Sequence, residues 1–141
     1  SQVGIYMDVV SGSCLCGEIE YEVRGVLGKM GHCHCGMCQK AHGAAYATYI
    51  NVAEEDFKFT KGETQLTVFQ SSNNVERTFC KTCGSNLQFR RPGKSRFGIT
   101  VGTLDGTVSR TPDHEIWTSA IPIWGSREGI PLRHETEHKQ V

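Results

Sequence analysis

Seven cysteines fall into three short groups along the chain, and this grouping restricts the fold more than any other sequence feature. The groups read CLC, CHCGMC and CKTCG, and they contain Cys14 and Cys16, then Cys33, Cys35 and Cys38, then Cys80 and Cys83. A chain of 141 residues can bury roughly two thirds of its surface, so disulfides are not needed merely to hold it together. Closely spaced cysteine pairs are instead typical of metal sites.

Two other uses of the cysteines are less favoured than metal binding. Three disulfides with a spare thiol are disfavoured, because the count is odd, no secretion signal is visible, and CxC and CxxC spacings suit reducing compartments. A redox CxxC needs a helix amino terminus that lowers the thiol pKa, whereas Cys80 follows a strand pattern. We therefore expect a cytoplasmic protein whose cysteines bind metal.

Seven sulfur ligands divide naturally into four and three. Cys14 and Cys16 are separated by one residue, so on a strand their side chains lie on the same face. Their sulfurs can then approach to ~3.8 Å, the S–S separation in a tetrahedral site with Zn–S bonds of ~2.3 Å. With Cys80 and Cys83 they predict a closed Cys₄ zinc site that joins an early strand to a late one. Gly84 follows the second pair and permits the positive φ of a tight knuckle.

The remaining trio lies within one short segment. Cys33, Cys35 and Cys38 supply three thiolates, which leaves a fourth coordination position for water or substrate, as in a catalytic zinc. The alternative is a closed Cys₃His site, in which the fourth ligand is a neighbouring histidine, His32, His34 or His42. Spacing alone slightly favours the open site. The sequence thus predicts two zinc ions, one structural and one catalytic or labile.

Outside the cysteine groups, apolar and polar residues alternate with a period of two, which predicts an all-β fold. The clearest strand spans residues 18–24, where Ile19, Tyr21 and Val23 share one face. Further strands are predicted at 46–50, 64–70, 75–79, 86–90 and 96–101, separated by turn-forming residues. Only residues 37–42 are expected to form a helical turn. We expect one domain over residues 1–141, with poorly ordered ends at 1–7 and 131–141.

Composition excludes two classes of partner. Fifteen basic residues balance fifteen acidic ones, whereas nucleic-acid binders usually show a basic excess and a basic stripe. The only dense basic cluster surrounds a Pro-Gly turn and is interpreted as a solvated hairpin tip: Arg90, Arg91, Lys94 and Arg96. A zinc-ribbon nucleic-acid binder, the third function considered, would show a steeply salt-dependent affinity. No apolar run approaches the ~20 residues of a membrane helix, so we expect neither nucleic acid nor membrane as a partner.

Several other side chains are candidates for the trio's site. His42 follows Cys38 by four residues and is a catalytic candidate that could contact a thiolate or relay a proton, with a structural histidine as the alternative. Lys40 is a candidate for binding a substrate carboxylate, although most surface lysines bind nothing. The sequence favours two roles equally for Trp117 and Trp124: packing in the core, or forming an aromatic wall of the site.

The sequence also contains a misleading motif near its end. Residues 134–138 read HETEH, which satisfies the HExxH pattern of zinc proteases. That pattern functions on a helix packed in a cleft with a further ligand, whereas this copy is followed by only three residues. We interpret it as part of a solvated tail.

Five segments together resemble the glutathione-dependent formaldehyde-activating enzyme family, which includes centromere protein V-like proteins. They are SGSCLCGEIEYEV, HCHCGMCQKAHGAAYATYI, FQSSNNVERTFCKTCGSNL, VGTLD and DHEIWTSAIPIW, the last of which contains His114. The resemblance implies a β-tent fold, in which two antiparallel sheets meet around a structural zinc. It also implies a Cys₄ zinc at the first and last cysteine groups and a second zinc on the CxCxxC trio, the same division that the spacing predicts.

The resemblance further implies an activity. Members of the family join formaldehyde to the thiol of glutathione to give S-hydroxymethylglutathione, and the class is a carbon–sulfur lyase in the reverse sense. We therefore expect a zinc-dependent lyase that binds a thiol such as glutathione and a small aldehyde. The alternative is a non-enzymatic interaction module in which both zinc ions are structural.

Overall fold

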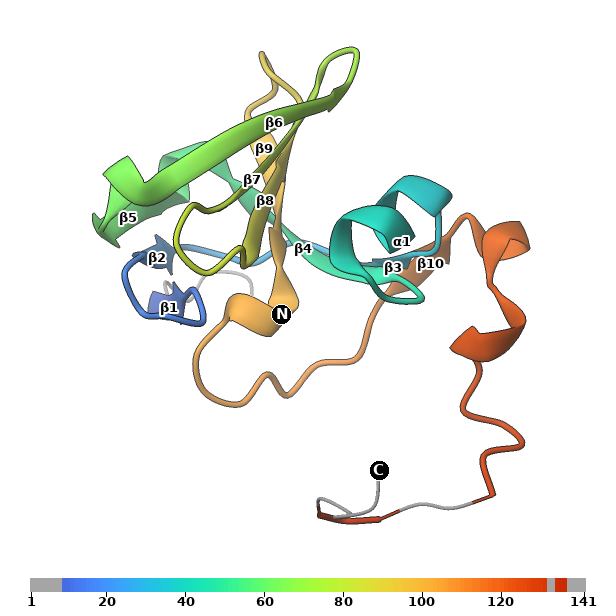
Figure 1. The fold of residues 1–141 in the computed structure, drawn as a ribbon. Coiled ribbons are helices and arrows are strands. Elements are labelled where there is room, and N and C mark those ends of the chain that lie inside the picture. Colours follow the sequence, from blue (N-terminus) through green and yellow to red (C-terminus); the bar gives the residue numbers. More distant parts are fainter. Residues whose placement is uncertain (1–8, 132–133, 137–141) are drawn as a thin grey trace.

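The computed structural model describes residues 9–131 and 134–136, so the ends predicted to be poorly ordered, 1–7 and 131–141, lie largely outside the described residues (Figure 1). The strands are β1 (Val9–Ser13), β2 (Glu20–Arg24), β3 (Met30–Cys33), β4 (Ala47–Ala53), β5 (Phe57–Lys61), β6 (Leu66–Ser72), β7 (Val75–Cys80), β8 (Asn86–Arg90), β9 (Arg96–Thr100) and β10 (His114–Ile116). The α-helix α1 spans Gly36–His42. Single 3-10 turns occupy Glu54–Asp56, Glu63–Gln65, Val101–Thr103, Thr118–Ala120 and Ile123–Gly125. None of the described helices is long and apolar enough to cross a membrane.

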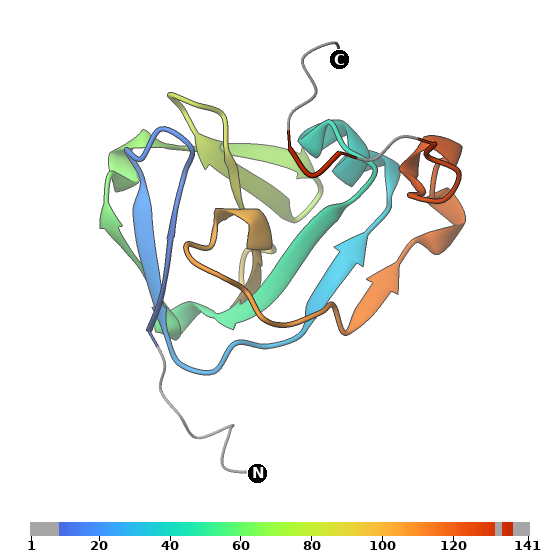
Figure 2. The same cartoon turned by 90° about the horizontal axis from the view of Figure 1, so that it is seen from below.

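The strands form two sheets, which confirms the predicted all-β single domain. One sheet has the order β1-β2-β5, and the other has the order β10-β3-β4-β9-β8-β7-β6. Neighbouring strands are antiparallel except β10, which pairs parallel to β3. Figure 2 shows the segment after β9 returning to the start of β3, so β10 enters the sheet in the direction of β3. The prediction that both sheets are purely antiparallel is therefore wrong for this edge strand.

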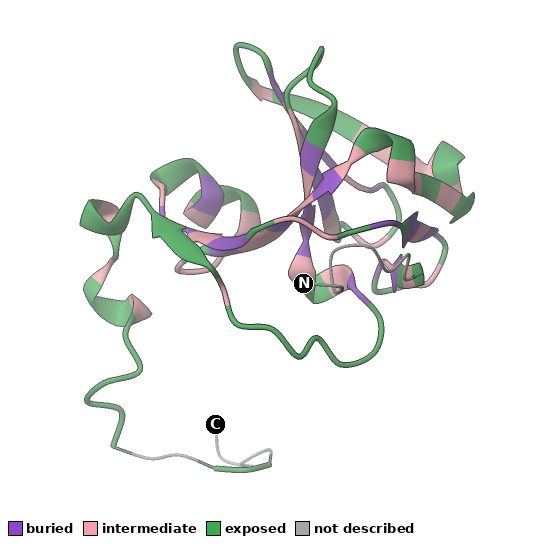
Figure 3. Cartoon of the chain, turned by 180° about the vertical axis from the view of Figure 1, so that it is seen from behind, coloured by how far each residue is buried: buried purple, intermediate pink, exposed green. Residues whose placement is uncertain are grey.

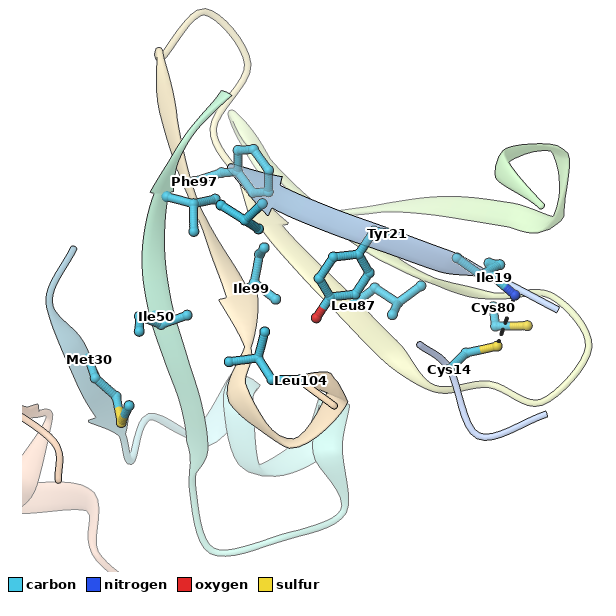
Figure 4. Close-up of a cluster of buried hydrophobic side chains, with 12 residues drawn as sticks. Cys14, Ile19, Tyr21, Met30, Ile50, Cys80, Leu87, Phe97, Ile99 and Leu104 are labelled. Atoms are coloured by element: carbon cyan, nitrogen blue, oxygen red, sulfur yellow. Dashed lines mark hydrogen bonds between the residues drawn. The ribbon is translucent and has the colours of Figure 1, made fainter. Parts of the chain in front are cut away.

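The core lies between the two sheets (Figure 4). As predicted, Ile19, Tyr21 and Val23 are all buried, and they pack with side chains such as Ile50 of β4 and Ile99 of β9. The ring of Tyr21 occupies the space in which a side chain at residue 12 would lie, so a glycine is required there. Its hydroxyl pairs with Thr103 Oγ1 at 2.7 Å, which satisfies the one polar atom of this buried ring.

The two ends of the molecule carry different cysteine groups (Figures 1 and 2). The β1–β2 loop and the β7–β8 turn lie together at one end, and β3, β10 and α1 lie at the other. Beyond β10 the described residues are mostly exposed (Figure 3). Trp117 and Trp124 are 64% and 67% exposed, so the option of core packing is wrong for both.

Candidate metal centres and the adjoining cleft

The first cysteine cluster, which we call the clip, joins the two sheets at one end of the molecule. Cys14 and Cys16 follow β1, whereas Cys80 ends β7 and Cys83 lies in the turn before β8. All four sulfurs lie within 4.8 Å of one another, with 3.6 Å between Cys14 and Cys16 and 3.8 Å between Cys16 and Cys80. These distances match the ~3.8 Å between sulfurs on a tetrahedral zinc, and every cysteine is a free thiol.

The turns around the clip direct hydrogen-bond donors at its sulfurs. The backbone N–H of Ile19 donates to Cys14 Sγ at 3.3 Å, a bond that is drawn dashed in Figure 4. Gly84 has φ +78°, which permits the tight turn after Cys83. Ser85 lies 3.3 Å from Cys83 Sγ, and its side chain and backbone lower the pKa of that thiol to about 5. Stabilised thiolates are the form that binds zinc.

The second cluster, which we call the trio, is built where β3 passes into α1. Cys33 ends β3, Cys35 caps the helix and Cys38 lies one turn into it. The three sulfurs lie within 4.8 Å of one another, and the N–H of Cys38 donates to Cys35 Sγ at 3.3 Å. The CxCxxC spacing thus gathers three donors because a strand end is followed directly by a capped helical turn.

No histidine among the described residues completes the trio, because no ring nitrogen lies within 4.8 Å of all three sulfurs. His32 pairs with Thr48 Oγ1 at 2.8 Å, and His34 Nε2 pairs with Glu115 at 2.9 Å. His42 Nε2 pairs with the hydroxyl of Tyr49 at 3.0 Å. The geometry therefore does not support the closed Cys₃His alternative.

Arg77 and Tyr49 form a hydrogen-bonded chain behind the trio that the sequence analysis missed. Arg77 donates from both terminal nitrogens to Cys38 Sγ, at 3.8 and 3.7 Å, and also to Tyr49 Oη at 3.2 Å. Burial raises the pKa of the Cys38 thiol to about 12, against the lowering effect of Arg77. A bound divalent cation supplies the positive charge that a buried thiolate needs, so three sulfurs at this spacing fit a metal ion.

The trio opens on a cleft of about 1500 Å³ that also touches Tyr49, Phe89 and Trp117. Its wall carries six basic side chains and no acidic one among the described residues: Lys29, Lys40, Arg77, Arg91, Lys94 and Arg96. The predicted hairpin tip is exposed, as expected of a solvated turn, but three of its four basic residues face this cleft. Only the fold could reveal this, because β9 returns beside β4 and brings the tip close to β3.

The structure places the other candidates at different distances from the trio. Lys40 is exposed and lines the cleft, whereas His42 is half-buried and reaches the trio only through Tyr49 and Arg77. His114 lies over β3 at a glycine, Gly31, where a Cβ would collide with its ring. Of the HExxH pattern, residues 134–136 are exposed and the rest lies outside the described residues.

These features define a class of protein: a small domain of two β-sheets with two cysteine clusters that could each hold a metal ion, for which zinc is a fitting choice. The family model for the glutathione-dependent formaldehyde-activating enzyme matches residues 9–120. The chain belongs to this family.

Two relatives extend the comparison. An uncharacterized lyase of Schizosaccharomyces pombe is 25% identical over 111 residues, which are 78% of this chain and 79% of that protein. The crystal structure of a Rhodobacter sphaeroides protein matches with a TM-score of 0.61 and 26% identity, over 74% of this chain and 98% of that chain.

Proposed function

We propose that the protein is a zinc-dependent carbon–sulfur lyase that forms and cleaves the adduct of an anionic thiol with a small aldehyde, with glutathione and formaldehyde as the first candidates. The observation that carries this proposal is the position of the trio, whose three sulfurs face a cleft lined by cations. Family membership and a relative named as a lyase support the reaction class.

The reaction needs no oxidant or reductant. The thiol sulfur bonds to the aldehyde carbon, the carbon–oxygen π bond opens, and the thiol proton is finally carried by the new hydroxyl group. Zinc on the trio would supply an open coordination position at which an incoming thiol is deprotonated. The cysteines hold that position at the floor of the cleft, while the clip holds a structural zinc.

Tyr49 and His42 are suited to move the proton. Tyr49 Oη accepts a hydrogen bond from Arg77, so its own O–H can donate to Nε2 of His42. Burial and the charge of Arg77 lower the pKa of His42, which keeps the imidazole neutral at neutral pH. Tyr49 also lines the cleft, so its hydroxyl can take a proton from the thiol as it passes its own proton to the neutral imidazole, and the reverse transfer returns the proton; this is the role we assign to His42.

The basic wall is suited to hold the rest of the thiol substrate. Glutathione carries two carboxylates, and the cleft offers Lys40 near the trio and Arg91, Lys94 and Arg96 on its far side. Cations lining one wall raise the local concentration of an anionic ligand. A reducing compartment such as the cytoplasm would keep all seven thiols available for this chemistry.

Exchange spectroscopy provides the decisive test. Carbon-13 formaldehyde and glutathione are mixed at equilibrium, and the rate of exchange between free formaldehyde and the adduct is measured with and without the zinc-loaded protein. We expect exchange to accelerate in proportion to protein concentration, and the acceleration to disappear in C35S. Exchange unchanged by the protein would favour the interaction module with two structural zinc ions.

A further inference from the structure

Arg77 is a buried cation fixed against the trio from several sides. It is only 7% exposed and lies in the middle of β7. Its Nε donates to Ser71 Oγ at 3.1 Å, and its guanidinium carbon lies 5.0 Å from the centre of the Phe89 ring. These contacts leave both terminal nitrogens directed at Cys38 Sγ.

The charge of Arg77 has no carboxylate partner among residues 9–131 and 134–136. A buried cation is costly unless an opposite charge compensates it. Cys38 Sγ accepts hydrogen bonds from both terminal nitrogens, so the counter-charge for this cation is the sulfur of Cys38 when a bound metal ion makes it a thiolate.

The charge balance of the trio explains why such a partner is useful. Three thiolates around a divalent cation carry one net negative charge, and a fourth, incoming thiolate raises this to two. Like charges brought together in a partly dehydrated cleft repel each other strongly. A fixed guanidinium beside one of the four sulfurs brings the net charge back to one negative charge.

We propose that Arg77 is a positioning residue whose charge, held against Cys38, allows the cleft to accept an anionic sulfur beside the trio. This inference rests on the proposed function, because it concerns how the thiol substrate is admitted. Arg77 also bridges β7 to Ser71 of β6 and to Tyr49 of β4, so a purely structural role is the competing explanation. The two roles can be distinguished by experiment. A purely structural Arg77 would change the stability of the fold and leave the affinity for an anionic thiol unchanged, whereas an Arg77 that balances charge would change that affinity.

The test loads the protein with Co²⁺ in place of zinc and follows the sulfur-to-cobalt absorption bands during titration with glutathione. R77Q removes the charge, and R77K keeps the charge without the two parallel donors. R90Q is the matched control, because Arg90 also stacks on a phenylalanine, Phe97, but pairs with Glu54 and does not contact a sulfur of either cluster. Thermal unfolding of each cobalt-loaded variant is recorded beside the titration.

We expect R77Q to bind cobalt at both clusters and to lose roughly 10- to 100-fold in affinity for glutathione, because the charge of the incoming thiolate is then no longer compensated. R77K should lose about threefold, and R90Q should match the wild type within about twofold. If R77Q does not fold, R77K decides, and glutathione affinity equal to that of the wild type would count against the proposal.

Three other outcomes overturn the inference in distinguishable ways. If the wild type binds glutathione and folded R77Q binds it equally well, Arg77 is only a structural strut, and the proposed function stands. If folded R77Q loses the cobalt of the trio, Arg77 retains the metal and does not admit the thiol. If the wild type itself binds no thiol at its cobalt, both the proposed function and this inference fail.

Discussion

The clip and the trio use the same donor atom in opposite ways. The clip draws four sulfurs from distant parts of the chain, and its Cys16 and Cys80 are separated by 64 positions. The trio draws three sulfurs from a single segment between Cys33 and Cys38, and it faces a cleft. An ion on the clip closes a long loop and fixes two sheets together, whereas an ion on the trio restrains a few residues and leaves a position free.

The surroundings of the two clusters follow the same division. The clip has local hydrogen-bond donors, such as the Ile19 N–H and Ser85, which stabilise thiolates. The trio is served by Arg77, a remote side chain on β7. Ligand number alone therefore does not describe how the clip and the trio differ. The supply of charge and the access to solvent must be considered with it.

The largest effect should come from matched serine substitutions. Cys16 of the clip is exposed and Cys35 of the trio is partly exposed, so neither change leaves a large cavity. C16S should lower the Tm by at least roughly 10 °C, because a structural zinc contributes ~10–16 kcal/mol in small zinc domains. C35S should lower it by less than about 3 °C, since serine can still cap α1. Equal losses in calorimetry would mean that the two clusters stabilise the fold to the same extent.

The next effect concerns metal release. With two zinc equivalents loaded, a chelator should remove one at least roughly tenfold faster than the other, equivalent to about 1.4 kcal/mol in barrier height. The fast equivalent should be missing from C35S, and it should be protected when glutathione fills the open position. A zinc-sensitive dye measures both phases. A single phase in the wild type would mean that the two clusters hold their ions alike.

Much of this division could be predicted from the sequence. Spacing separates the cysteines into four and three, and the structure gathers the sulfurs in the same sets. The six strands predicted from period-two patterns are all present, and the predicted helical turn is α1. These features are local. Side chains two positions apart on a strand share a face, and side chains three positions apart on a helix share a turn, whatever the rest of the fold is.

What the sequence could not reveal depends on long-range pairing. Strands β1, β3, β5 and β10 were missed: β3 and β10 have only four and three residues, β1 (VVSGS) does not alternate, and the alternation of β5 (FKFTK) was overlooked. Arg77 is one of several arginines, and nothing in the letters around it indicates that β7 carries it to Cys38. The basic wall was likewise missed, because Arg91 and Lys29 come together only through the order of β3, β4 and β9.

A smaller effect should follow from neutralising the basic wall. R91Q/K94Q should raise the KM for glutathione roughly threefold to tenfold at low salt and leave kcat unchanged, because exposed charges contribute modestly to binding. The difference should shrink as salt is added, since the side chains are exposed. K81Q, an exposed lysine beside the clip, is the control and should have no effect. An equal change with a neutral thiol would indicate lost shape and not lost charge.

The smallest effect should come from Asp113, which attaches β10 to β3 on the side of the trio. Its carboxylate accepts from the N–H of Met30 at 2.9 Å and pairs with Arg110, and these contacts hold its pKa below the ordinary value. A lowered carboxyl pKa stabilises the fold above the unfolded value of ~3.8, and this contribution is lost as the pH falls through the folded pKa. The stabilising contribution of Asp113 is therefore fully present at pH 7. The D113N variant removes this contribution at that pH, where the bound metal ions are not lost as they would be in acid.

For D113N we expect a change in Tm within about 2 °C, together with faster hydrogen exchange at the amides of β3 and β10. Exchange around the clip should be unchanged, because Asp113 bonds to Met30, and Figure 4 shows Met30 on the opposite side of the core from Cys14 and Cys80. Such a pattern would show that the end bearing the trio opens independently of the end bearing the clip. Faster exchange spread evenly over both ends would mean that the two sites share one cooperative unit, and the difference between them would then lie in chemistry alone.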